Sequence, residues 1–317
     1  MRTIVAVHKL EERHLRRIRE AAPGWTVIDG SDKAALEEHL PDAEIVFGWN
    51  RSVRDLVGNG SSKLRWVQYW GAGVDRLPLQ KLQQLGVVLT NASGVHPYPI
   101  AETIFAMLLS FTRHLNLSLR NQAERKWETT GTLGEAHGRT IGILGVGAVG
   151  LETARLAKAF NMNVLGIRRS GEPAQWVDQM YTLEGIHEVL GSSDYIINCL
   201  PHTRETEHIM GREQFEAMKP SAYYINIGRG KTTDTDALVD ALQNGQISGA
   251  GLDVFESEPL APEHPLWAME NVILTPHIAG DTTVYEERIA GIFLENLSLY
   301  LQSGQPSLNV VDLQKEY

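Results

Sequence analysis

A short apolar strand that ends in a glycine-rich turn constrains this chain more than any other segment. Thr-Ile-Gly-Ile-Leu at 140–144 is followed by Gly-Val-Gly-Ala-Val-Gly at 145–150 and by an alanine-rich helical pattern at 151–160. In such a unit Gly145 permits the tight turn, Gly147 lets the backbone approach a pyrophosphate, and Gly150 lets the helix pack closely on the strand. The helix N-terminus offers free N–H groups to the anion. A second strand at 163–167 completes the pattern, which therefore predicts a dinucleotide-binding βαβ unit.

The end of that second strand indicates which dinucleotide binds. An NAD site usually places Asp or Glu there to bond the ribose 2′-hydroxyl, whereas this chain has Arg168, Arg169 and Ser170. Guanidinium groups bind phosphate bidentately, so the segment favours a 2′-phosphate and therefore NADP(H). The plain alternative is that both arginines belong to a solvated loop. A weaker candidate for the same phosphate is the loop Pro201-His202-Thr203-Arg204, which follows the apolar run at 195–200.

Length and composition limit the class of protein. A chain of 317 residues predicts two domains. The net charge of -10 and the pI of about 5.6 argue against a nucleic-acid partner, because such a surface needs clustered Lys and Arg. No signal peptide or run of 18 apolar residues is visible, so we expect a cytoplasmic protein with no membrane segment. The single cysteine, Cys199, lies in an apolar run and is interpreted as a core residue rather than a nucleophile.

Strand and helix signals alternate in two blocks. The first block has strands at 3–7, 25–28, 45–47, 66–69 and 87–90 and helices at 10–21 and 33–40; the second has strands near Ile141, Val164, Tyr195, Tyr223, Gly249 and Val272. Pro97-Tyr98-Pro99 suggests a boundary, followed by one long helix at 100–123 that crosses between domains, and an amphipathic helix at 284–303 returns to the first domain. We predict an α/β protein with two Rossmann-like domains, doubly wound parallel sheets and a cleft between them. The first domain, flavodoxin-like, comprises residues 1–98 and 282–317. The second, the Rossmann dinucleotide-binding domain, comprises residues 99–281.

Four segments of the second half place polar groups directly after apolar runs. They are Asn-Ile-Gly-Arg-Gly at 226–230, Gly-Leu-Asp-Val-Phe at 251–255, Glu-Ser-Glu-Pro-Leu at 256–260 and Thr-Pro-His-Ile-Ala-Gly at 275–280. Ligands of doubly wound sheets bind outside the carboxyl ends of the strands, so we expect these groups to converge. Of the eleven histidines, His14, His39 and His187 lie in polar helix patterns and are predicted to be solvated, whereas His277 follows a strand that looks buried.

Together with Gly-Ala-Gly-Val-Asp at 71–75 and Gly-Val-His-Pro-Tyr-Pro-Ile-Ala-Glu at 94–102, these segments resemble the D-isomer-specific 2-hydroxyacid dehydrogenase family through nearly the whole chain. Because Arg168 and Arg169 stand at the end of the second strand, the chain most resembles the NADP-dependent glyoxylate/hydroxypyruvate and 2-oxoacid reductases of this family. The resemblance implies NADPH-dependent reduction of a small 2-oxo acid to the D-2-hydroxy acid. It also implies that the first domain binds the substrate, and that the protein is a homodimer formed through the nucleotide-binding domain, with the helix at 100–123 as a plausible contact.

The resemblance also assigns roles to residues. His277 matches the general acid that protonates the carbonyl oxygen, Glu258 the carboxylate that keeps this imidazole protonated and oriented, and Arg229 the group that grips the substrate's carboxylate. Backbone amides of Ala72 and Gly73 would hold the other carboxylate oxygen. Asp253 matches the residue that bonds the nicotinamide carboxamide. The implied cofactor contacts are Gly145, Gly147, Ala148, Val149, Gly150, Arg168, Arg169, Ser170, Leu200, Pro201, Ile227, Asp253 and Gly280.

Several readings stay open at this point. His96 either touches a ligand or packs in a hinge, Trp127 either closes the substrate pocket or belongs to the core, and Trp49-Asn50-Arg51 is a candidate reader of the substrate's side chain. Because residue 258 is Glu and not Gln, formate oxidation is disfavoured. An NAD-linked D-2-hydroxyacid dehydrogenase and a dinucleotide-sensing corepressor of the same fold are the competing functions. No H-E-x-x-H, paired C-x-x-C or calcium loop is present, and the hydride and proton steps need no metal.

Overall fold

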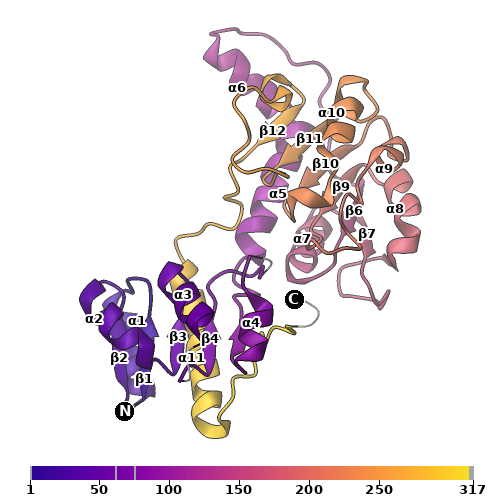
Figure 1. Ribbon diagram of the computed structural model, residues 1–317. Helices are drawn as coiled ribbons and strands as arrows, with labels where there is room; N and C mark the ends of the chain where they lie inside the picture. The colour runs from indigo at the N-terminus through magenta and orange to yellow at the C-terminus, as the bar shows by residue number, and fades with distance from the viewer. Residues whose placement is uncertain (1, 61–62, 75, 314–317) are drawn as a thin grey trace. The chain divides into compact units, whose positions relative to one another are not determined.

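The computed structural model describes residues 2–60, 63–74 and 76–313, and the chain divides into two compact units (Figure 1). One unit comprises Met1–Val95 with Thr282–Tyr317, and the other His96–Asp281. The chain therefore passes from the first unit to the second three residues before the predicted domain boundary. Pro97 and Pro99 lie in the first turn of helix α5 rather than in a linker, because the first turn of a helix tolerates proline, whose missing N–H would have no intrahelical acceptor there.

The N-terminal unit holds a five-stranded sheet in the order β2-β1-β3-β4-β5, in which neighbouring strands run parallel. This is the strand order of flavodoxin-like sheets. The strands are β1 Thr3–Ala6, β2 Thr26–Asp29, β3 Ile45–Phe47, β4 Trp66–Gln68 and β5 Val88–Thr90. The helices are α1 Glu12–Ala21, α2 Lys33–His39, η1 Leu40–Asp42, α3 Arg51–Asn59, α4 Leu79–Gln84 and α11 Tyr285–Ser303. Helices α3 and α4 were not among the elements predicted from the sequence.

Side chains alternate between the two faces of this sheet and build a core on each. On one face Ile4 and Trp66 pack with helices α1 and α11, and Phe293 of α11 stacks on Phe47 with ring centroids 4.3 Å apart. On the other face Val5 and neighbouring valines pack with helices α2, α3 and α4. Helix α11 is therefore an integral layer of the N-terminal unit, although it follows the whole second unit in sequence.

The second unit holds a seven-stranded parallel sheet in the order β12-β11-β10-β9-β6-β7-β8. Its strands are β6 Thr140–Leu144, β7 Asn163–Ile167, β8 Gln179–Tyr181, β9 Tyr195–Asn198, β10 Tyr223–Asn226, β11 Gly249–Leu252 and β12 Val272–Leu274. Strand order reverses at β6, as in Rossmann sheets. The prediction of two parallel α/β sheets is confirmed. The six predicted strands are all present, but β8 was missed because it is a three-residue edge strand whose side chains are not fully buried.

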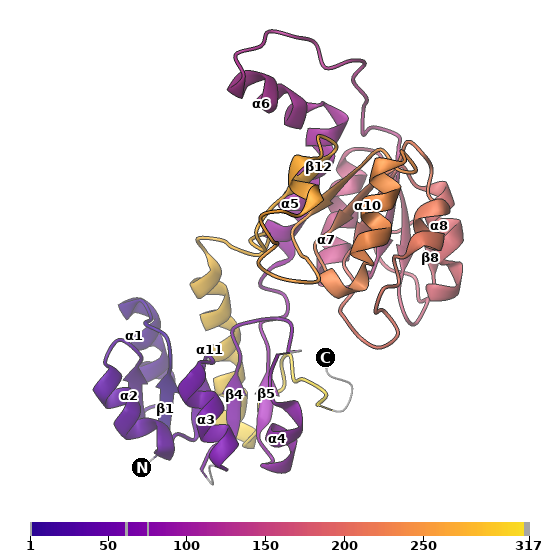
Figure 2. The same cartoon turned by 45° about the horizontal axis from the view of Figure 1, so that its top comes forward.

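Helices cover both faces of this sheet (Figure 2). Helices α5 Pro97–Thr112 and α7 Ala148–Ala159 pack on one face, and α8 Ile186–Ser192, α9 Arg212–Glu216 and α10 Thr235–Gln243 on the other. The short helices are η2 Leu183–Gly185, η3 Gly230–Thr232 and η4 Pro265–Ala268. The single long helix predicted at 100–123 is wrong: His114 adopts a left-handed conformation (φ 51°), which ends α5 and starts α6, Leu115–Ala123.

One predicted surface residue is buried. His14 has no solvent-exposed area, although its neighbours Arg13 and Arg16 are exposed. It lies one helical turn before Ile18, on the face of α1 that packs against α11. The prediction that His14 is solvated is therefore wrong, because the covering helix comes from the far end of the chain.

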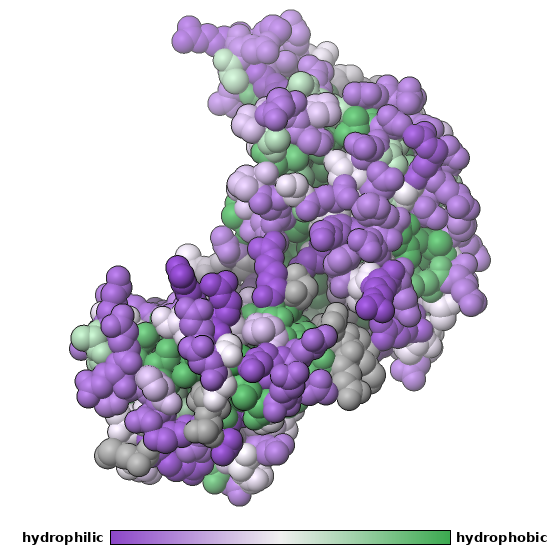
Figure 3. Space-filling model, viewed as in Figure 1, coloured by the Kyte–Doolittle hydropathy of each residue, from purple (hydrophilic) through white to green (hydrophobic). Residues whose placement is uncertain are grey.

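In the part of the chain that the structure describes, no helix is both long and apolar enough to cross a membrane. The face shown in Figure 3 carries mostly hydrophilic residues on both units, and each unit also shows small apolar patches.

Candidate active site

The structure shows why the turn after β6 requires glycine residues. Gly145 has φ +97°, a conformation that favours glycine. A Cβ on Gly150 would lie 2.6 Å from the carbonyl oxygen of Gly145, so helix α7 approaches the turn as closely as backbone atoms allow. A Cβ on Gly147 would meet nothing within 4 Å, so the space in front of this residue is open. Two glycines thus shape the turn, while the third leaves room for a ligand.

The N-terminus of α7 has donors available for an anion. Gly147 is the N-cap and has no capping side chain, and its carbonyl accepts from the N–H of Leu151. The N–H groups of Ala148, Val149 and Gly150 belong to the first turn, where a helix has no internal acceptors for them. Such groups, together with the positive end of the helix dipole, bind phosphates. The turn therefore fits a dinucleotide's pyrophosphate.

The arginine segment after β7 is exposed and faces the loop after β9. Arg168, Arg169 and Ser170 all lie at the surface. The Arg169 guanidinium is 3.9 Å from the carboxylate of Glu205, and both side chains are mostly exposed, so this ion pair contributes little free energy. Because β7 and β9 flank β6 in the sheet, their loops border the glycine turn on its two sides. Arg204 of the second loop is exposed as well.

Two of the three cofactor contacts predicted after β9 and β10 are buried. Leu200 and Ile227 are buried, whereas Pro201 is exposed. A Cβ on Gly228 would lie 2.6 Å from the carbonyl oxygen of Leu200, so the two turns touch through their backbones. Burial raises the pKa of the Cys199 thiol to about 12. Cys199 is half-buried and packs against the core, and its thiol stays protonated at neutral pH, as expected of a packing residue rather than a nucleophile.

His277 and Glu258 form a hydrogen-bonded pair in the second unit. Nδ1 of His277 lies 2.9 and 3.0 Å from the two carboxylate oxygens of Glu258. Since a carboxylate only accepts, Nδ1 carries a hydrogen and the pair fixes the orientation of the ring. Nε2 is then the ring nitrogen available to an external partner. His277 is 45% exposed at its side chain and has φ +56°, so a left-handed backbone presents the ring to solvent.

Asp253 holds the loop that carries His277. Its side chain is 2% exposed and accepts from three donors: the Thr275 hydroxyl at 2.6 Å and the N–H groups of Ile278 and Ala279 at 2.9 and 3.0 Å. The buried carboxylate therefore has the partners that its burial requires. A carboxylate offers about four acceptor positions, so roughly one remains for a ligand such as a carboxamide.

Arg229 lies at the end of the neighbouring strand β10. Its Nη1 donates to the Gly228 carbonyl at 2.8 Å, and the residue is half-buried. A Cβ on Gly230 would lie 1.9 Å from the carbonyl carbon of Phe255, so the turns after β10 and β11 press together. Because β10, β11 and β12 are adjacent and parallel, Arg229, Asp253 and His277 follow the carboxyl ends of three neighbouring strands. The expected convergence of these segments is observed for His277, Glu258 and Asp253, which share one hydrogen-bonded loop system.

A second histidine–glutamate pair was missed by the sequence analysis. Nε2 of His208 is 2.6 Å from Oε1 of Glu256, and Oε2 of Glu256 accepts from the N–H of Thr235 at the start of α10. Glu256 precedes Glu258 by two residues, and the N–H of His208 donates to the Lys231 carbonyl, two residues beyond Arg229. The pair thus braces the segments that carry Glu258 and Arg229. The sequence analysis had noted the segment that contains Glu256, but its partner His208 lies 48 residues away, so no local pattern links the two residues.

The remaining predicted residues are placed as follows. His96 packs against Gly280, where a Cβ would lie 2.8 Å from the imidazole Cδ2, so Gly280 makes room for this ring. Trp127 is fully exposed, so its interpretation as a core residue is wrong: it lies in the segment after α6, where no residue that the structure describes covers the indole. Asn50 caps α3, and Arg51 is exposed at its start.

In the N-terminal unit, Ala72 and Gly73 lie after β4, where the Ala72 carbonyl accepts from Asn91 Nδ2 at 2.8 Å. Asp75 of the same motif lies outside the described residues.

Comparison with known proteins shows the family of this chain. The model of the D-isomer specific 2-hydroxyacid dehydrogenase NAD-binding domain matches residues 105–279. A glyoxylate reductase of Korarchaeum cryptofilum is 33% identical over 314 residues, which cover 96% of this chain and 94% of that relative.

Two solved structures extend the match to both units. A D-isomer specific 2-hydroxyacid dehydrogenase family protein of Aeromonas salmonicida has a TM-score of 0.86 and 33% identity, covering 98% of this chain and 99% of that one. An NADPH-dependent glyoxylate/hydroxypyruvate reductase of Sinorhizobium meliloti, solved with NADP and sulfate, has a TM-score of 0.83 and 28% identity and covers 100% of both chains. With the glycine turn, the Rossmann strand order and these matches together, the chain belongs to the D-isomer specific 2-hydroxyacid dehydrogenase family of oxidoreductases, which use a nicotinamide dinucleotide.

Proposed function

We propose that this protein reduces a small 2-oxo acid, of the glyoxylate or hydroxypyruvate kind or larger, to the D-2-hydroxy acid with NADPH. The observation that carries the proposal is the His277–Glu258 pair, held by Asp253 at the same sheet edge as the glycine turn. The names of the Korarchaeum and Sinorhizobium relatives, both glyoxylate-type reductases, support the substrate class.

The residues have distinct roles in this proposal. His277 donates the Nε2 proton to the carbonyl oxygen of the substrate, and Glu258 accepts from Nδ1 and so stabilises the imidazolium before transfer. Arg229 binds the substrate's carboxylate through its planar fork, and the amides of Ala72 and Gly73 are further proposed donors to it. A reduced nicotinamide, when bound, supplies the hydride. Asp253 positions the His277 loop and has an acceptor position left for the carboxamide.

NADP(H) is the proposed cofactor because the end of β7 carries two exposed guanidinium groups and a hydroxyl where an acid would serve NAD. A bound 2′-phosphate replaces the weak pairing of Arg169 with Glu205 by a charge-assisted contact. The complex of the Sinorhizobium relative with NADP supports this choice. The alternative is an NAD-linked dehydrogenase in which the arginines bind nothing.

The deciding experiment is the initial rate of cofactor oxidation with NADPH and with NADH, each against glyoxylate, hydroxypyruvate, pyruvate, phenylpyruvate and a branched 2-oxo acid. We expect turnover with at least one acid and a clear preference for NADPH. Equal kcat/KM with both cofactors would favour the NAD-linked alternative. Inactivity with both, despite measurable NADPH binding, would favour a non-enzymatic, corepressor-like sensor.

Two substitutions test the residue assignments. His277→Ala should lower kcat by about two to four orders of magnitude while NADPH still binds, and His187→Ala, an exposed histidine on α8, is the matched control. Arg168→Asp should shift the cofactor preference toward NADH by roughly 1 to 3 kcal/mol, the range of a charge-assisted hydrogen bond. A larger shift from Arg204→Asp would place the phosphate in the loop after β9 instead.

We also propose a homodimer that uses the region of α6. No residue of this helix is buried, and Leu115, Leu119, Trp127 and Leu133 expose 52%, 56%, 103% and 43% of their areas. Several large exposed apolar side chains within twenty residues of sequence are typical of a segment that another chain covers. A monomer mass in light scattering would contradict this proposal. The cytoplasmic location stays a prediction from the sequence.

A further inference from the structure

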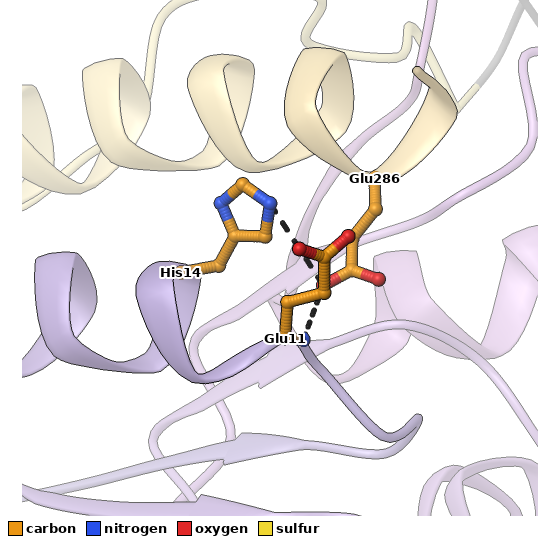
Figure 4. Close-up of side chains that lie close together, drawn as sticks. All are labelled: Glu11, His14 and Glu286. Atoms are coloured by element: carbon orange, nitrogen blue, oxygen red, sulfur yellow. Dashed lines mark hydrogen bonds and ion pairs between the residues drawn. The ribbon is translucent and has the colours of Figure 1, made fainter. Parts of the chain in front are cut away.

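The buried His14 of α1 lacks hydrogen bonds at both ring nitrogens. Neither Nδ1 nor Nε2 has a hydrogen-bond partner among the residues that the structure describes, and the side chain has no exposed area. An unsatisfied buried polar group costs about 1–3 kcal/mol. In Figure 4 the ring lies between helices α1 and α11, with Nε2 pointing toward the carboxylates of Glu11 and Glu286. The side chain is therefore directed at an acidic pair that it does not reach.

The three side chains form a compact set of possible metal ligands. One donor atom from each of Glu11, His14 and Glu286 lies within 4.8 Å of the other two. Glu11 is the N-cap of α1, and Glu286 lies in the first turn of α11. Nε2 of His14 is 3.9 Å from Oε1 of Glu286 and 3.7 Å from Oε2 of Glu287. These separations exceed hydrogen-bond length, so protonation of the ring would not by itself satisfy Nε2.

The charges around His14 leave room for a cation. Three carboxylates, those of Glu11, Glu286 and Glu287, face two guanidinium groups, those of Arg13 and Arg17. Arg13 pairs with Glu11 at 2.8 Å, and Arg17 pairs with Glu287 at 2.9 Å. The Glu286 carboxylate accepts a hydrogen bond from the Glu11 backbone N–H at 2.5 Å. The cluster thus keeps one negative charge more than positive, and Arg13 is the cation that competes for Glu11.

We propose that Glu11, His14 and Glu286 bind a transition-metal dication, for which Zn²⁺ is the probe. One imidazole nitrogen and carboxylate oxygens are ligands that Zn²⁺ accepts, at about 2.0–2.2 Å. Two ligands on one ion are then about 3.4 Å apart in tetrahedral geometry, so the present set must contract by roughly an ångström. Rotation of the two glutamate side chains, 55% and 24% exposed, provides that freedom. Glu287 or water completes the coordination.

The bound ion links the first turn of α11 to the start of α1. Helix α11 begins three residues after the chain re-enters the N-terminal unit at Thr282, so the site fixes the start of the returning segment. It would act by stabilising this unit and takes no part in the proposed reduction. Sequence motifs do not show it, because Glu11 and Glu286 are 275 residues apart.

The test is equilibrium dialysis of tag-free protein, stripped with chelator, against ZnCl₂, followed by metal analysis. We expect one Zn²⁺ per chain at micromolar concentration and a rise in Tm, because a ligand of the folded state stabilises it. Glu11→Gln, at an exposed residue, and Glu286→Gln, at a half-buried one, should each weaken binding by at least about tenfold. Glu20→Gln, an exposed glutamate on the same helix, is the matched control and should bind as the parent does.

Further measurements distinguish binding at this site from binding elsewhere on the protein. Arg13→Gln should tighten binding, because it removes the competitor for Glu11. Binding weaker than about 100 μM would overturn the proposal. So would an unchanged stoichiometry in the Glu11→Gln/Glu286→Gln double variant, which would place the ion elsewhere, for example at His277 and Glu258. Circular dichroism of each variant confirms that loss of binding is not loss of folding.

Discussion

Replacing Gly150 by Ala tests the geometry of the nucleotide turn without touching a reactive group. In an ordinary helix this change stabilises by about 0.5–1 kcal/mol, since glycine loses more backbone entropy on folding. Here the new methyl group would lie 2.6 Å from the Gly145 carbonyl oxygen and 3.1 Å from Ile143 Cγ2. Both neighbours are held, because Ile143 is fully buried and the N–H groups of Gly145 and Val146 bond the Ile167 carbonyl.

The helix must therefore move away from the strand, and such overpacking costs typically about 1–3 kcal/mol. After the propensity gain is subtracted, we expect a net loss of up to about 2.5 kcal/mol, or up to roughly 10 °C in the Tm of a unit of this size. The displaced turn should also weaken NADPH binding by about tenfold or more, because the first-turn N–H groups shift from the pyrophosphate.

Differential scanning calorimetry and isothermal titration with NADPH measure the two effects. The matched control is Gly291→Ala in α11, a helical glycine whose Cβ would meet nothing within 4 Å, so this change should be neutral or stabilising. If Gly150→Ala proves as stable as Gly291→Ala and binds NADPH normally, the close approach of α7 to the turn is not real and the argument fails.

Three further outcomes follow from the site. Glu258→Gln should lower kcat at neutral pH with little change in NADPH affinity, because a neutral amide no longer stabilises a charged His277; unchanged kcat would remove its role. Asp253→Asn should lower the free energy of unfolding in urea by about 1–3 kcal/mol, because the side-chain NH₂ group replaces an oxygen that accepts from a backbone N–H; Asp281→Asn, at an exposed residue that follows the His277 loop, should leave stability unchanged. Because burial raises the pKa of Cys199 to about 12, against about 8.5 when unfolded, iodoacetamide at pH 8 should label the folded protein far more slowly than the urea-unfolded one. By the same linkage stability should fall as pH rises above about 8.5, where only the unfolded thiol ionises, and Cys199→Ala should lose this dependence.

The sequence by itself determined the features whose cause is local. The glycine turn needs a left-handed residue at 145 and no side chain at 150, and both requirements act within eleven residues of β6, its turn and the start of α7. Strands with continuous apolar runs, such as Ile141 to Leu144, are recognisable because parallel sheets are buried on both faces. Polar groups after such strands converge because parallel strands end at one edge, which predicted the meeting of His277, Glu258 and Asp253.

The tertiary structure alone decided features whose cause lies far along the chain. Strand β8 forms because it pairs with the edge of β7. The residues of β8 have too weak an apolar pattern to predict a strand from the sequence. His208 and Glu256 pair across 48 residues, and His14 is buried by a helix that starts at Tyr285. Local periodicity reports which face of a helix is apolar, but burial depends on what covers that face. A histidine in a charged helix can therefore be a solvated residue or a buried one directed at two glutamates, and only the packing of α11 on α1 distinguishes them.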